Sequence, residues 1–283
     1  MTNILSEHNS IDSLEISDDA LAKINLILED RRNFSLSVYK DKCMKRRIAI
    51  RMRACHCLDA AAYCRLLQQS DQELDLLKKN LTIHVSHFFR NPSMFDKLQQ
   101  TVLPELFLNA GRANQPLRLL SLGCAGGEEA YSIGIILRHF FGRELLRTSV
   151  EINAYDIDAD ILQAARRGEY NEDRLKDILP ELKERYFVAN GALMQLSVDI
   201  REMVSFQLFN IMDIESIVPC HIVLCRNTLI YFNRADQGKI LRGIANILPQ
   251  GGILVLGKSE TLTGPIRPLF TSECPAERIY RRL

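Results

Sequence analysis

The chain has 283 residues, of which 47% are hydrophobic and 25% are charged, and its formal net charge at pH 7 is +1. This length accommodates one large domain or two domains with separate hydrophobic cores, and the composition is that of an ordinary globular protein. The near-zero net charge excludes a whole-molecule field that would attract nucleic acid or an anionic membrane, so electrostatic recognition has to depend on local patches.

The sequence carries no signal for export or membrane insertion. No apolar run approaches the roughly 18 residues that span a bilayer. The polar start, MTNILSEHNSIDS, lacks the basic and apolar regions of a secretory signal. Eight cysteines without regular spacing are typical of reduced thiols rather than of a disulfide framework. We therefore expect a cytoplasmic protein that does not insert into the membrane.

The first hundred residues predict a small helical domain. Ser17, followed by two aspartates, is typical of a helix N-terminus, and apolar residues recur on one face behind it. Further helical patterns cover residues 39–53, 59–69, 71–81 and 92–100, and no alternating strand pattern precedes residue 115. We expect a helical N-terminal domain over residues 1–106, and a polar linker with glycine and proline at residues 109–116.

Beyond this linker the pattern becomes that of an α/β domain, expected over residues 117–283. Helical patterns separate several short apolar runs, which predicts crossover connections and a mostly parallel sheet. Residues 187–206 contain alternating stretches and an Asn-Gly pair, which predicts a small antiparallel insert. The expected strands of the main sheet are residues 117–122, 150–155, 204–208, 222–225 and 253–256.

A glycine-rich turn follows the first expected strand in LLSLGCAGGEEAYSIGIIL. A strand, a glycine turn and a helix place backbone N–H groups at the carboxyl end of a parallel sheet, where open α/β folds bind ligands. The spacing of Gly123, Gly126 and Gly127 does not match the dinucleotide fingerprint. Glu128 and Glu129 open the helix and favour a cationic ligand over a pyrophosphate. The alternative is a structural turn whose acids stabilise the helix N-terminus.

The second expected strand ends in AYDID. An acid at this position commonly binds ribose hydroxyls in nucleotide-binding sheets. Asp156 is the better placed residue, and Asp158 is expected to cap the helix that begins at Ala159.

Two other motifs resemble ligand sites only superficially. The stretch GILVLGKS matches the letters of a phosphate-binding loop, but its four central residues form a strand pattern whose N–H groups belong to neighbouring strands. The stretch CHCLDAAAYC holds zinc-ligand residue types, but Cys-x-Cys is not the usual ligand gap. We expect neither nucleotide hydrolysis nor a metal.

Four basic residues project onto one face of the second expected helix. At about 100° per residue, Lys42, Lys45, Arg46 and Arg53 fall within an arc of roughly 100°. The face is either solvated or a docking site for an acidic macromolecule.

Together the motifs resemble the CheR family, the chemoreceptor glutamate methyltransferases of bacterial chemotaxis. The resemblance runs from about residue 24 to the C-terminus and is carried, in order, by HVSHFFRNP, GCAGGEEAYS, YDIDADIL, CRNTLIYFN and GKSETL. It implies a helical domain followed by a Rossmann-like S-adenosylmethionine-dependent methyltransferase domain with a small β-subdomain. It also implies transfer of methyl groups to glutamates in the Glu-rich methylation region of a chemoreceptor's cytoplasmic helical bundle, for sensory adaptation. The product of the donor would be S-adenosylhomocysteine.

Matching positions imply roles for individual residues. Arg90 would lie beside the donor and the incoming carboxylate, and Tyr231 would face the reacting methyl. Glu129 would hold the methionine ammonium and Asp156 the ribose. The other implied donor contacts are Ser86, His84 (where the family often has Asn), Asn210 and Ile211 at the adenine, and Asn227 and Thr228 at the methionine end.

The chain departs from the family in one loop. The family's β-subdomain can carry a longer Gly-rich loop that docks a tethering peptide, whereas the corresponding stretch here is only ANGA, residues 189–192. We therefore expect no dependence on a receptor tether. Two alternatives stay open: methylation of a related receptor outside chemotaxis, and a non-catalytic module that binds the donor or its product. A nicotinamide oxidoreductase is disfavoured by the glycine spacing.

Overall fold

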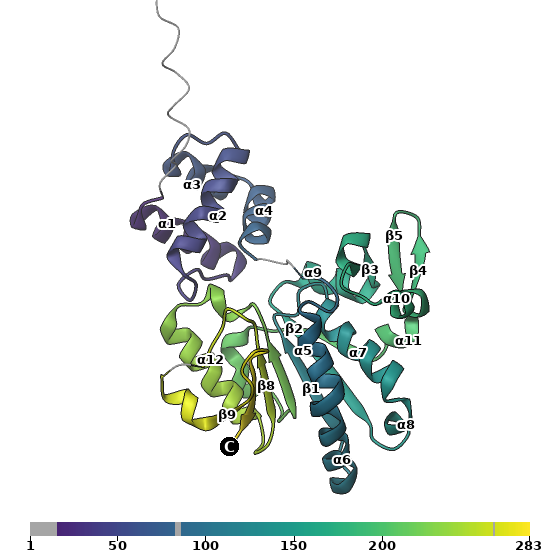
Figure 1. Ribbon diagram of the computed structural model, residues 1–283. Helices are drawn as coiled ribbons and strands as arrows, with labels where there is room; N and C mark the ends of the chain where they lie inside the picture. Colours follow the sequence, from purple (N-terminus) through teal and green to yellow (C-terminus); the bar gives the residue numbers. More distant parts are fainter. Residues whose placement is uncertain (1–15, 83–85, 263) are drawn as a thin grey trace, which may run out of the picture. The chain divides into compact units, whose positions relative to one another are not determined.

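The computed structural model describes residues 16–82, 86–262 and 264–283 (Figure 1). The described chain divides into two compact units. The first contains the residues up to 82 together with Tyr231–Asn233, and the second contains 86–230 and 234–283. The division falls at residues 83 and 84, earlier than the boundary expected at 106.

The described part of the first unit, from residue 16 on, folds as four helices. Its N-terminal cap is as predicted, because the Ser17 side chain accepts a hydrogen bond from the backbone N–H of Ala20 at 3.2 Å. Asp59 and Ser70 cap the third and fourth helices in the same way. The helices are α1 (Asp18–Arg32), α2 (Asp41–Ala54), α3 (Ala60–Gln69) and α4 (Asp71–Leu81).

A buried polar network joins three of these helices. The Glu73 carboxylate of α4 accepts a hydrogen bond from the Tyr63 hydroxyl of α3 at 2.7 Å and pairs with the Arg51 guanidinium of α2 at 2.5 Å. Burial alone would raise the pKa of Glu73, but hydrogen bonds from Arg51, Tyr63 and Cys55 outweigh burial and lower that pKa below its usual value. The network therefore stabilises the folded domain while Glu73 is ionised.

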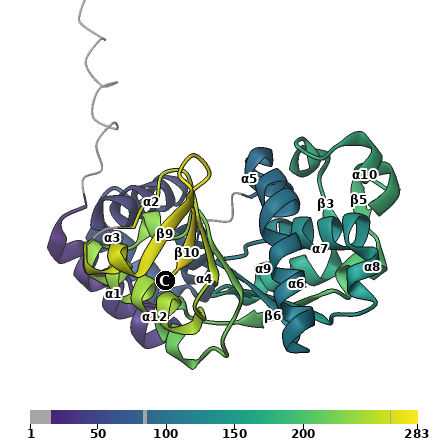
Figure 2. The ribbon, with the colours of Figure 1, turned by 60° about the horizontal axis from the view of Figure 1, so that its bottom comes forward.

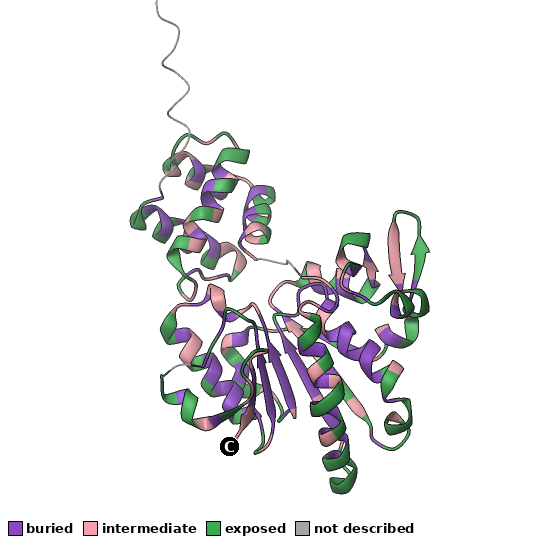
Figure 3. Ribbon diagram, in the orientation of Figure 1, coloured by how far each residue is buried: buried purple, intermediate pink, exposed green. Residues whose placement is uncertain are grey.

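A seven-stranded sheet forms the centre of the second unit, and its middle strands are buried (Figure 3). All of the strand predictions for this sheet are confirmed, with the second strand one residue longer than expected. The strand order is β6-β2-β1-β7-β8-β10-β9, in which the first five strands are parallel and β10 pairs antiparallel with both β8 and β9. The strands are β1 (Leu117–Leu122), β2 (Val150–Asp156), β6 (Val204–Leu208), β7 (Ile222–Cys225), β8 (Ile253–Leu256), β9 (Phe270–Cys274) and β10 (Ile279–Arg282).

The stretch GILVLGKS is a strand, as predicted. Its apolar residues form β8, all four of them buried, and pair with β7 on one side and β10 on the other. Their N–H groups belong to the sheet and do not form a phosphate cradle.

Helices α6 and α7 both contact β1 (Figure 1), and α9 contacts β6 (Figure 2). Among the described residues, none of the helices is long and apolar enough to cross a membrane. The helices of this unit are α5 (Pro92–Lys97), the π-helix η1 (Leu98–Val102), α6 (Leu103–Ala113), α7 (Glu128–Phe140), α8 (Gly142–Leu145), α9 (Ala159–Arg167), α10 (Pro180–Tyr186), α11 (Val198–Arg201) and α12 (Arg234–Ile247), with the 3₁₀ turns η2 (Glu172–Leu175), η3 (Ile211–Ser216), η4 (Leu229–Tyr231) and η5 (Gly264–Leu269).

The linker expected at residues 109–116 is wrong over most of its length. Helix α6 continues to Ala113, and Phe107 and Ala110 on its inner face are buried in the core of the sheet unit. The polar residues of this stretch form the outer face of an amphipathic helix. Glycine and asparagine among them are typical of loops, and for this reason the sequence pattern indicated a linker.

The small antiparallel sheet is present, with different limits from those expected. Its strands are β3 (Glu169–Tyr170), β4 (Phe187–Asn190) and β5 (Leu193–Leu196), in the order β3-β5-β4. The insert thus begins near residue 169 and ends before β6, which belongs to the main sheet. Strand β3 is too short to leave a periodic signal in the sequence.

We predict that replacing Glu73 with Gln costs about 3 kcal/mol of unfolding free energy, because Arg51 is left without its carboxylate. Because the pKa of Glu73 is lowered in the fold, its contribution to stability is present above the unfolded pKa and is lost as pH falls through the folded pKa. Urea unfolding across a pH series measures both effects. The control is Asp75→Asn, which removes an exposed partner of Arg32. Equal effects of the two variants would contradict the assignment.

Candidate functional site

The glycine turn after β1 lies where three neighbouring strands, β2, β1 and β7, end at their carboxyl edge. Gly123 has a φ of +68°, and a side chain there would meet the Thr228 hydroxyl at 2.4 Å, so only glycine fits. The N–H groups of Gly123 and Cys124 donate to the Tyr155 carbonyl at the end of β2. The turn is therefore fixed between the loop after β7 and the end of β2.

Asp156 is at the end of β2, as predicted, and it orients the glycine turn. Its carboxylate accepts hydrogen bonds from the N–H groups of Ala125 at 2.9 Å and of Asp158 at 3.1 Å. Ala125 has a positive φ of 49°, a conformation that its bond to Asp156 supports. The Asp158 side chain caps helix α9, which begins at Ala159, as predicted.

Glu129 lies at the same edge and is half-buried. Its carboxylate accepts the Ser121 hydroxyl at 2.7 Å and pairs with the Arg226 guanidinium at 2.9 Å. A carboxylate can accept about four hydrogen bonds, so these two leave capacity for an ammonium group.

Arg226 is a site residue that the sequence reasoning missed. Its side chain is only 3% exposed, and besides Glu129 it donates to the Arg90 carbonyl at 2.6 Å and the Asn91 side chain at 2.8 Å. It also lies over the Phe95 ring. The sequence did contain a signal for this residue, because Arg226 directly follows a buried strand and lies within the motif CRNTLIYFN. Through Arg226 the structure brings the backbone of Arg90 close to Glu129.

The two acids that open α7 have different environments. Glu128 is buried and pairs with Arg174 at 3.1 Å, so it contributes to the packing of the insert against the turn. Only Glu129 shares Arg226 with the Arg90 segment. The interpretation that the acids bind a cationic ligand therefore stays a prediction for Glu129, whereas Glu128 pairs with an arginine of the protein.

Asn210 and Ile211 follow β6. The Asn210 side chain caps η3 by accepting the Met212 N–H at 3.0 Å, and Ile211 is buried behind it. Both residues thus lie beyond the carboxyl end of the strand that neighbours β2.

The loop that carries Asn227 and Thr228 is held by a buried carboxylate. Glu260, from GKSETL, accepts the N–H groups of Gly257 at 2.7 Å, Asn227 at 2.9 Å and Ile230 at 3.3 Å. Burial raises the pKa of Glu260, and these N–H donors partly oppose that rise. Glu260 thereby fixes Asn227, whose φ is +56°. The motif GKSETL by itself does not indicate this role.

The structure describes two of the three remaining predicted site residues, Tyr231 and Ser86. Tyr231 belongs to the first unit, where its carbonyl accepts the Lys40 N–H at 2.8 Å. His84 lies outside the described residues. The Ser86 carbonyl accepts a hydrogen bond from the Arg174 guanidinium.

The basic residues of α2 divide into two groups. Lys42, Arg46 and Arg53 are exposed, whereas Lys45 is half-buried and pairs with Asp18 at 2.5 Å.

The cysteines of CHCLDAAAYC are half-buried free thiols, and burial raises the pKa of Cys55 to about 11. No group of His, Cys, Asp and Glu that could hold a metal is found within the part of the chain that the structure describes.

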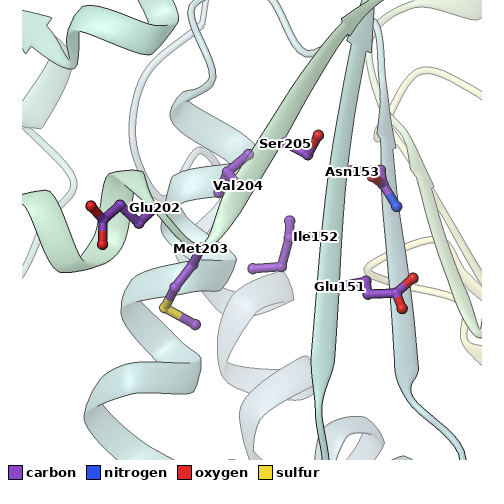
Figure 4. A pocket seen from close by; sticks show the side chains of 7 residues that line it. All are labelled: Glu151, Ile152, Asn153, Glu202, Met203, Val204 and Ser205. Carbon is purple, nitrogen blue, oxygen red and sulfur yellow. The ribbon is translucent and has the colours of Figure 1, made fainter.

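A shallow hollow lies away from the candidate site (Figure 4). It is lined from β2 and from the stretch that enters β6, including Glu151, Asn153 and Ser205. These residues lie toward the amino ends of the two strands, whereas Asp156 ends β2 at the opposite edge. Open α/β folds place ligands at the carboxyl edge, so this hollow is not the candidate site.

The residues at the carboxyl edge fit S-adenosylmethionine. The Glu129 carboxylate would suit the ammonium of this donor, the Asp156 carboxylate its ribose hydroxyls, and the apolar side chain of Ile211 its adenine.

Two family models match the chain consecutively. The CheR methyltransferase all-alpha domain matches residues 19–82, and the CheR methyltransferase SAM-binding domain matches residues 84–275.

Several relatives share this match. The chemotaxis protein methyltransferase 1 of Pseudomonas aeruginosa is 35% identical over 71% of this chain and 74% of that protein. The chemotaxis protein methyltransferase of Escherichia coli is 29% identical over 88% of this chain and 87% of that protein. An uncharacterized 104.1 kDa protein of Rhodobacter capsulatus is 32% identical over 96% of this chain, which spans only 28% of that protein. A solved O-methyltransferase family protein from Burkholderia thailandensis is 14% identical over 57% of this chain and 39% of that chain, with a TM-score of 0.32.

We predict that Glu260→Gln weakens binding of S-adenosylhomocysteine about tenfold, because an amide cannot accept N–H groups on both of its polar atoms. In the unsubstituted chain, binding weakens as pH falls through the raised pKa of Glu260, since only the ionised carboxyl accepts all three bonds. The variant lacks this pH step. Titration calorimetry over a pH series measures both effects, with Glu273→Gln, on β9, as the control. A variant with unchanged affinity and an unchanged pH profile would refute the role.

Proposed function

Because the chain belongs to the CheR methyltransferase family and is an S-adenosylmethionine-dependent methyltransferase, we propose that it esterifies glutamate side chains of chemoreceptors. The observation that carries this proposal is the link through Arg226. It joins the Glu129 carboxylate, which suits the donor's ammonium, to the backbone of Arg90, which would bind the acceptor.

The reaction needs alignment more than acid–base catalysis. With a reference pKa of about 4.3, a glutamate side chain is almost fully ionised near neutral pH and needs no general base. S-adenosylmethionine supplies an electrophilic methyl group. A bond forms between a carboxylate oxygen of the acceptor and the methyl carbon, while the carbon–sulfur bond breaks with its electron pair on sulfur. The protein has to hold oxygen, carbon and sulfur in a line.

Arg90 and Tyr231 are the proposed catalytic residues. A bidentate grip of Arg90 on both carboxylate oxygens would orient the acceptor but weaken it as a nucleophile. Arg90 therefore holds one oxygen, and Tyr231 shapes the other side of the acceptor. The proposed donor contacts are His84, Ser86, Glu129, Asp156, Asn210, Ile211, Asn227 and Thr228.

The exposed stripe of α2 suits an acidic helix. Lys42, Arg46 and Arg53 lie on one face together with Ile50, an exposed apolar residue at 43%. Cations around an apolar contact complement a Glu-rich receptor helix in charge and in surface character. The proposed partner is the methylation region of a chemoreceptor's cytoplasmic bundle, which places the reaction in the cytoplasm.

The proposed reaction does not depend on a receptor tether. The β4–β5 hairpin turns through Gly191, whose φ is +61°, with only one further residue between the two strands. This supports a β-subdomain without the longer docking loop.

We expect labelled methyl from S-adenosylmethionine to appear on receptor cytoplasmic fragments and to be released by alkali as methanol, because a carboxyl methyl ester is base-labile. Arg90→Ala should lower turnover at least about a hundredfold, since it loses the orientation of the acceptor. Arg118→Ala, which removes a surface partner of Glu151 at the other end of β1, is the control.

Normal turnover of Arg90→Ala would refute its catalytic role. Donor binding without label on any of several receptor fragments would refute the proposed acceptor and favour a binding module.

We also expect Arg46→Glu with Arg53→Glu to raise the KM for the receptor fragment about tenfold and to weaken its salt dependence, because the electrostatic attraction to the acidic helix is reduced. Binding of S-adenosylhomocysteine should not change. The matched control carries the same charge change on other helices, as Lys23→Glu with Lys79→Glu. Equal effects of the two pairs would show that net charge acts, and not the α2 stripe.

A further inference from the structure

The inserted β-subdomain holds the segment that leads to Arg90. Phe88 is completely buried, with its ring edge-on to Tyr170 of β3 at 4.8 Å and to Phe187 of β4 at 5.1 Å between centroids. Its N–H donates to the Arg174 carbonyl at 2.9 Å. The residues just before Arg90 are therefore packed against the insert by both side chain and backbone.

Tyr170 and Arg174 of the insert also contact the glycine turn and the helix that follows it. The Tyr170 hydroxyl donates to the Gly126 carbonyl at 2.6 Å. One guanidinium nitrogen of Arg174, Nη1, donates to the Glu128 carboxylate at 3.1 Å and to the Ser86 carbonyl. Tyr170 and Arg174 thus each join the region of the glycine turn to the segment before Arg90.

A second bridge runs directly between the turn and this segment. The Phe89 N–H donates to the Ser132 hydroxyl at 2.9 Å, and that hydroxyl donates to the Glu128 carbonyl at 2.6 Å. Glu128 is therefore tied to the segment through its backbone as well as through Arg174. Its side chain is only 3% exposed, so its charge requires a partner inside the protein.

We propose that Arg174 is a positioning residue for methyl transfer. It sets the distance between the glycine turn, with the start of α7, and the segment that leads to Arg90. It does so by holding the Glu128 carboxylate and the Ser86 carbonyl on one nitrogen. The β-subdomain then serves the reaction itself, whether or not a receptor peptide docks on it. This proposal rests on the proposed function for the acceptor-binding role of Arg90.

Arg174→Met tests the proposal, because it keeps the length of the side chain and removes both hydrogen bonds. We expect kcat for receptor methylation to fall about tenfold to a hundredfold while the Kd for S-adenosylhomocysteine changes less than about threefold. Arg174→Lys should recover much of the rate, since one ammonium can donate to both oxygens. The control is Arg185→Met, an arginine of the same insert that stacks on Tyr186.

The double variant Arg174→Met with Glu128→Gln separates positioning from stability. It removes the uncompensated carboxylate, so the thermal midpoint should recover, whereas kcat should stay low because Ser86 is still released. Recovery of both quantities would show that Arg174 acts on stability alone and would overturn the proposal. Wild-type kcat in Arg174→Met would overturn it as well.

Hydrogen exchange provides a readout that does not depend on the acceptor. The amides of Phe88 and Phe89 should exchange faster in the double variant than in the unsubstituted chain. The released segment would move away from the acceptors of these amides, the Arg174 carbonyl and the Ser132 hydroxyl. Unchanged exchange would overturn the positioning role. If the unsubstituted chain labels no receptor while this exchange effect is present, the proposed acceptor fails and the positioning of the segment stands.

Discussion

The candidate site depends on one buried cation. The Arg226 guanidinium pairs with Glu129 after β1 and holds the Arg90 carbonyl, so two segments far apart in sequence meet at the end of β7. A buried charge is stable only where its partners satisfy it closely. The position of the Arg90 backbone is therefore coupled to that of Glu129 through Arg226.

Two further buried carboxylates extend this arrangement. Glu128 is bound to Arg174, and Glu260 accepts backbone N–H groups from the loop that carries Asn227. Through Arg174, Glu128 is linked to the segment before Arg90, and Glu260 fixes the loop that follows β7. A reaction that needs linear alignment of three atoms gains from loops set before the substrates arrive, because little reorganisation is then left to the reacting complex.

In the helical unit the polar network of Glu73 has a comparable role. It ties α2 to α3 and α4 from the inside, through Arg51, while Arg46 and Arg53 on the same helix are exposed. Lys45 and Arg51 of this helix thus bind partners within the domain, whereas Arg46 and Arg53 are exposed to solvent. The buried network fixes α2 within the helical unit, and the direction of its exposed face is fixed with it.

The sequence by itself determined the parallel strands, the caps at Ser17 and Asp158, and the glycine turn, because burial on both faces, capping and a positive φ each restrict the residue types locally. Only the tertiary structure decided that Glu128 faces Arg174, that residues 109–113 are helical and that Arg226 joins Arg90 to Glu129. These outcomes depend on partners up to 136 positions apart. Local propensity carries no information about such distant partners, because burial and charge pairing arise only when the chain is packed.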